Sequence, residues 1–168
     1  MKRVIWIVWM GLITLACQES ENTSDFTGNE MTYALRPGSE YEISGTVVFK
    51  ERRDGTTTIV VNLTGTDGSD RLPVHVHLGD VSQADVEVAV LLNPVDARTG
   101  KSETWLTRLA NETEVTYAGL LQLEACIKIH LADTGPGRDV VLAAGNIGES
   151  FNKSIASGRT AIGVCKSE

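Results

Sequence analysis

Three histidines are the residues of this chain best suited to chemistry, and they are its only histidines. His75 and His77 lie two residues apart in an alternating segment, so both imidazoles share one face of a strand and the aliphatic residues share the other. His130, far downstream, also opposes the aliphatic residues beside it. Three imidazoles from two strands could converge on one metal ion, and they suit zinc, copper, iron or nickel. The alternative is three structural histidines that are hydrogen-bonded to loops.

The elements that must position these histidines are predicted to be strands. Period-two alternation dominates from residue 40 onward, and no long stretch has a convincing helical period, although 115–123 admits one helical turn. Arg53-Asp54-Gly55 is typical of a hairpin turn. The strand segments are 41–49, 59–63, 72–78, 86–92, 105–109, 125–131, 140–144 and 159–165. This pattern predicts an all-β fold, a Greek-key β-sandwich or flattened barrel of about eight antiparallel strands.

The beginning of the chain has the pattern of an export signal. Lys2 and Arg3 precede an uncharged apolar run at 4–16, which is short for a membrane-spanning helix. The run leads into Ile13-Thr14-Leu15-Ala16-Cys17, which resembles a bacterial lipobox. This resemblance makes 1–17 a lipoprotein signal peptide and Cys17 the lipid-modified residue that anchors the protein in the membrane. Gln18 after it favours the outer membrane of the bacterial cell envelope. A soluble secreted protein is the alternative.

Removal of the signal peptide would make the protein more acidic. Of the 15 basic residues, Lys2 and Arg3 would be lost, which leaves 13 against 22 acidic residues, a net charge of about −9. This charge argues against nucleic acid as a partner, and the sequence names no protein partner. Residues 18–39 are polar and low in aliphatic side chains, which is typical of a flexible tether. Residues 40–168 are predicted to form a single β-sandwich domain.

Two cysteines remain in the chain after Cys17. Export would place them in an oxidising compartment, where an even pair usually forms a disulfide, so we predict a bridge between Cys126 and Cys165. Neither cysteine lies on the aliphatic face of its own strand. Free buried thiols are the alternative, because the sequence does not fix the geometry that a disulfide needs.

Three motifs, in order along the chain, resemble the copper/zinc superoxide dismutases. They are Pro73-Val74-His75-Val76-His77-Leu78-Gly79-Asp80, Lys128-Ile129-His130 and Ser157-Gly158-Arg159-Thr160-Ala161-Ile162-Gly163-Val164. The likeness spans residues 41–165 and implies a superoxide dismutase-like fold. It also implies a copper-type site of His75, His77 and His130, with zinc as the alternative metal. Arg159 would steer an anion to this site or form a surface salt bridge, and Asp133 would accept an imidazole N–H behind it.

The chain departs from that family where zinc would bind. No histidine lies between His77 and His130, so the bridging histidine and the zinc histidines are absent, and dismutase activity is expected to be weak or absent. A second resemblance, to bacterial CHRD (chordin-type) domains, rests on Leu92-Asn93-Pro94, Gly100-Lys101-Ser102 and Ile127-Lys128-Ile129-His130. It implies a metal-free binding or structural module of the cell envelope, with no cofactor. A copper-scavenging protein without turnover is a further alternative.

Overall fold

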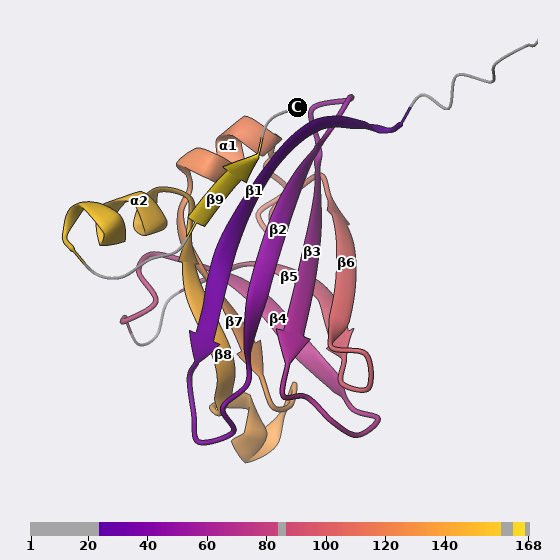
Figure 1. Cartoon of the computed structure of the whole chain (residues 1–168), viewed down its shortest axis with the longest axis vertical. Coiled ribbons are helices and arrows are strands. Elements are labelled where there is room, and N and C mark those ends of the chain that lie inside the picture. The colour runs from indigo at the N-terminus through magenta and orange to yellow at the C-terminus, as the bar shows by residue number, and fades with distance from the viewer. Residues whose placement is uncertain (1–23, 84–86, 159–162, 167–168) are drawn as a thin grey trace, which may run out of the picture.

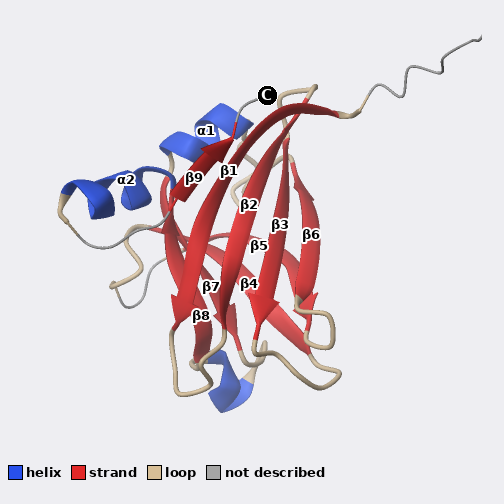
Figure 2. Ribbon diagram, viewed as in Figure 1, coloured by secondary structure: helices blue, strands red, loops and turns tan. Residues whose placement is uncertain are grey.

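The computed structural model describes residues 24–83 and 87–158, and the backbone of 163–166. Strands dominate this part of the chain (Figure 2). They are β1 (Phe26–Pro37), β2 (Ser44–Arg52), β3 (Thr57–Thr64), β4 (Arg71–Leu78), β5 (Val88–Asp96), β6 (Lys101–Leu106), β7 (Glu124–His130), β8 (Val141–Ile147) and β9 (Gly163–Lys166). The helices are α1 (Tyr117–Gln122), the 3-10 helix η1 (Gly135–Arg138) and α2 (Gly148–Ala156).

Eight of the strands close into an antiparallel barrel (Figure 1). Neighbouring strands follow the order β1-β2-β3-β6-β5-β4-β7-β8, and β8 returns to β1 through the pairs Arg36↔Ala144 and Pro37↔Ala143. The connections from β3 to β4 and from β6 to β7 pass over intervening strands, as in a Greek key. β9 pairs with residues 30–33 of β1, outside the closed ring. The predicted all-β flattened barrel of about eight antiparallel strands is confirmed.

A single hydrophobic core fills the barrel, because alternate residues of the strands face inward. Its largest fully buried side chains include Tyr33, Phe49, Ile59, Leu120, Ile127, Ile129, Leu142 and Ile147. Tyr33 packs edge to face against Phe49 of β2, with ring centroids 5.2 Å apart, and against Phe151 of α2, at 5.0 Å. The last contact attaches α2 to the core.

The first strand corrects the prediction that 18–39 is a flexible tether. Residues 26–37 form β1, which pairs with β2 from Phe26 to Leu35. Tyr33 and Leu35 are buried in the core, and Met31 packs against it. These three residues alternate with Thr32 and Ala34, which are only partly buried, so a low average content of aliphatic residues concealed a strand that has one buried face.

Helices and strand ends differ from the sequence pattern in two places. α1 lies where one helical turn was expected, whereas α2 was not predicted, because Phe151 and Ile155 are its only large apolar residues. β5 continues through Asn93 and Pro94, which were expected to end it. On its other edge β5 pairs with β4, and Pro94 lies where that ladder shifts register, between the pairs Leu72↔Val95 and Val74↔Leu92, so its missing N–H falls at a bulge and not in a regular ladder. Among the described residues, no helix has the length and apolar character needed to cross a membrane.

Candidate metal site

The three histidines lie on the outer face of the barrel. β4 carries His75 and His77, and β7 ends with His130, while the aliphatic residues that alternate with them belong to the core. The register shows that the His75 side chain points outward. His75 pairs with Leu91 of β5, paired residues lie on the same face of a sheet, and Leu91 is 65% exposed. The strand parity in the sequence therefore indicated the correct side of the sheet.

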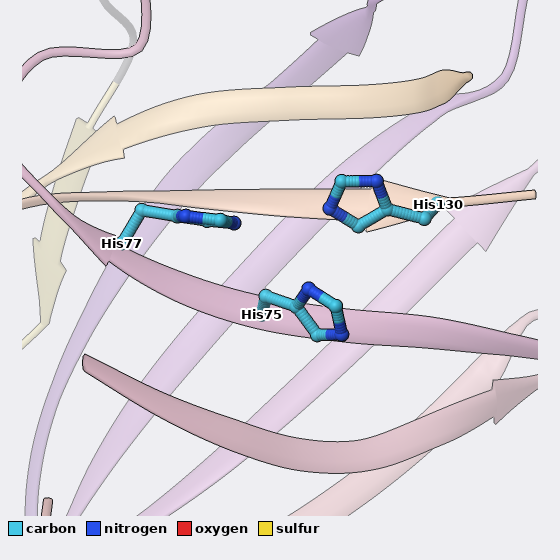
Figure 3. A group of neighbouring side chains, drawn as sticks. All are labelled: His75, His77 and His130. Carbon is cyan, nitrogen blue, oxygen red and sulfur yellow. The ribbon is translucent and has the colours of Figure 1, made fainter. Parts of the chain in front are cut away.

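The three imidazole rings converge (Figure 3). One nitrogen from each lies within 4.8 Å of the other two, and the ring centroids of His75 and His130 are 4.7 Å apart. His75 pairs with Lys128 and His77 pairs with Cys126, so His77 and His130 occupy the two ends of the group. Their rings extend along the strands toward each other, with centroids 6.0 Å apart. The prediction that these side chains meet is confirmed.

The orientation of His130 is set by a backbone carbonyl. His130 Nδ1 lies 2.7 Å from the carbonyl oxygen of Arg138, at the end of η1. A carbonyl only accepts, so Nδ1 carries the hydrogen and Nε2 of the neutral ring has its lone pair available. Nε2 is buried and has no hydrogen-bond partner in the described part of the chain. Buried polar atoms are nearly always satisfied, and a histidine that ligates a metal typically donates its other N–H in this way.

Burial keeps two of the rings neutral. The exposed fractions of His75, His77 and His130 are 9%, 7% and 7%. Burial lowers the pKa of His75 from 6.5 to about 4, and the neighbouring His130 and His77 lower it further. Burial also lowers the pKa of His130, against the opposing effect of its hydrogen bond to Arg138. Near pH 7 both rings are therefore in the form that binds metal.

The group that accepts the N–H of His130 differs from the one that the sequence suggested, which was Asp133. Asp133 is exposed and acts on His75 as a nearby charge, which raises the pKa of that imidazole slightly against the larger effect of burial. The acceptor of the His130 N–H is the Arg138 carbonyl instead. Arg138 was not singled out because a backbone carbonyl leaves no side-chain signal. The only indication in the sequence was the Gly135-Pro136-Gly137 turn, which places the Arg138 carbonyl next to His130.

Most of the remaining predicted site residues fall outside the described part of the chain. Cys17 and Arg159 lie outside the described residues, so lipidation and anion steering stay predictions. Cys126 is a buried free thiol among the described side chains, and burial raises its pKa to about 11. The side chain of Cys165 lies outside the described part, and the disulfide likewise stays a prediction.

The donor set fits a first-row transition metal. Three imidazole nitrogens without a carboxylate among them suit zinc, copper, nickel or iron, whereas magnesium and calcium require oxygen ligands. Bonds of about 2.0 Å in a tetrahedral site place ligand nitrogens roughly 3.4 Å apart. The ligand nitrogens, which lie within 4.8 Å of one another, thus need to approach by about 1.4 Å at most, which side-chain rotation can provide.

Comparison with models of known protein families finds no match, and comparison with curated proteins finds none either. The likeness to the dismutases and to the CHRD domains therefore rests on the motifs quoted above, and the histidine group is the structural feature that points to a function.

Proposed function

We propose that this protein is a lipid-anchored envelope protein that binds a copper-type metal ion through His75, His77 and His130. The observation that carries the proposal is the His130 ring, whose Nδ1 is occupied by a carbonyl while its buried Nε2 is aimed into the group. A histidine that served only to fill space would not need two further imidazoles facing its Nε2. Zinc is the alternative metal.

Binding is favoured over rapid catalysis at this site. The three rings are at most 9% exposed, so little of the site is open to a diffusing substrate. The sequence offers no further histidine to bridge a second metal or to relay a proton. We therefore expect dismutase activity to be weak or absent, and metal retention or scavenging to be the stronger activity. When bound, the metal supplies Lewis acidity or one-electron redox chemistry.

The test is a calorimetric titration of the metal-free protein with Cu(II) and, separately, with Zn(II). We expect one ion per chain, and we expect His77→Ala and His130→Ala each to weaken binding by about a hundredfold or more because a ligand is lost. Leu91→Ala is the matched control, since Leu91 lies on the same face beside His75 and offers no ligand atom. Equal binding by all four proteins would exclude this site and favour a metal-free CHRD-like module.

A further inference from the structure

A second candidate site lies on the same outer face as the histidines, above β8. It is a pocket of about 500 Å³ bounded by β1, β7, β8, α2 and the loop that follows β4. Pockets of 300–1,000 Å³ are typical of sites for small organic molecules. The pocket contains none of the three histidines, so the metal site does not account for it.

One wall of the pocket is a fixed network of hydrogen bonds. Asn146 accepts from the Val81 backbone N–H at 2.7 Å, and its amide donates to Asp80 at 2.8 Å and to the Ser154 hydroxyl at 2.7 Å. Asp80 also accepts from the backbone N–H and the hydroxyl of Ser82. Asp80, the only carboxylate among the described lining residues, is thus surrounded by donors, and its negative charge is held against the wall.

Two cationic side chains reach the pocket from different strands. Lys128 comes from β7 and Arg36 from β1. The Lys128 ammonium donates to the Gln83 carbonyl at 3.3 Å, which uses one of its three donors. With Asp80 included, the described residues of the lining have a formal charge of +1 in a chain whose net charge is −7. This local reversal of sign favours an anionic ligand.

The rest of the lining is largely apolar. Val141 and Ala144 project outward from β8, Phe151 comes from α2, and Pro37 ends β1. Such a surface binds a hydrocarbon body, while a charged group at the mouth fixes its orientation. An inorganic anion alone would leave this surface unused.

We propose that the pocket binds a small organic monocarboxylate, with its carboxylate between Lys128 and Arg36 and its hydrocarbon body against Val141, Ala144 and Phe151. The site is independent of metal binding, although Lys128 also pairs in register with His75 and so lies between the two sites. The ligand class is defined by this combination of two cations and an apolar floor.

Calorimetric titration of the full chain with octanoate, octanol and acetate tests the ligand class. We expect one octanoate per chain, and we expect octanol, which lacks the charge, and acetate, which lacks the hydrocarbon body, to bind at least about tenfold more weakly. Octanol that binds as tightly as octanoate would overturn the role of the cations. Acetate that binds as tightly would overturn the apolar component, and no octanoate binding would overturn the proposal.

Variants locate the site. Lys128→Gln should weaken octanoate binding by about tenfold or more, because a charged hydrogen bond is lost. Ala144→Phe should abolish binding by filling the pocket, with an unchanged cooperative thermal transition showing that the chain folds. Lys101→Gln, an exposed cation on β6, is the matched control and should bind normally. His77→Ala should also bind octanoate normally, which separates this proposal from metal binding. Normal binding by both pocket variants would show that octanoate binds elsewhere and would overturn the proposal.

Discussion

Acidification should destabilise the metal-free protein through His75. An unfolded histidine has a pKa near 6.5, whereas burial and the neighbouring imidazoles lower the pKa of His75 in the folded protein to about 4. Between these two values the unfolded chain takes up a proton that the folded chain does not. The free energy of unfolding is therefore unaffected by this group above pH 6.5, falls as the pH drops from 6.5 to 4, and levels off below that.

The size of the effect follows from the two pKa values. At about 1.4 kcal/mol per tenfold change in proton affinity, the His75 contribution is about 2.5 kcal/mol at pH 4.5 and about 3.4 kcal/mol at its limit. His75 is 9% exposed, so solvent screens this contribution little. His130, whose pKa is also lowered by burial, acts in the same direction. This loss is a large fraction of the stability of a typical domain.

The loss of stability through His75 can be measured by urea unfolding in the presence of a chelator, at a series of pH values from 7.5 to 4.5. His75→Gln keeps a polar side chain but cannot take up the proton, and both proteins share every other titrating group. We expect the stability advantage of wild type over His75→Gln to shrink by about 2.5 kcal/mol over this range. Parallel curves would show that His75 titrates at its ordinary pKa and would refute the argument from burial. An NMR titration of the imidazole protons gives the same pKa directly.

Three further predictions concern the anchor, the thiol and the barrel closure. Cys17→Ser should release the protein from the membrane fraction, and unchanged fractionation would contradict the lipid anchor. Cys126 should resist thiol reagents at pH 8 in the folded protein, because burial raises its pKa to about 11. If it also resists them when the protein is unfolded without reductant, the thiol is bridged, and mapping of the unreduced peptides should show Cys165 as its partner, whereas rapid labelling excludes a bridge. Gly145→Ala should lower stability by about 1–3 kcal/mol in urea unfolding, because the new methyl group meets the Ala34 carbonyl where β8 crosses β1. Wild-type stability would show that the strands can separate there without cost.

Local pattern predicted the direction of the histidines but not their neighbours. The parity of His75 and His77 against the aliphatic residues of their strand showed that they face outward, because side chains alternate strictly along a strand. Their approach to His130 depends on the register of β4 with β7, which pairs residues about 50 positions apart and is set by the packing of the whole barrel.

The features that the sequence did not reveal have physical causes. β1 was concealed because its buried residues, Tyr33 and Leu35, alternate with less buried ones in a segment that has few large aliphatic side chains. α2 is held by the packing of Phe151 on Tyr33, a tertiary contact, rather than by a helical repeat. The Arg138 carbonyl is a backbone group, and every residue has one, so only the folded turn identifies it as the partner of His130.

The most direct test of the metal site is electron paramagnetic resonance of the Cu(II)-loaded protein, with pulsed methods that count the coordinated imidazoles. We predict three imidazole nitrogens on one copper ion in the wild type, and two in His130→Ala. Two or fewer in the wild type, or a spectrum that His130→Ala leaves unchanged, would contradict the claim that His75, His77 and His130 bind one metal together.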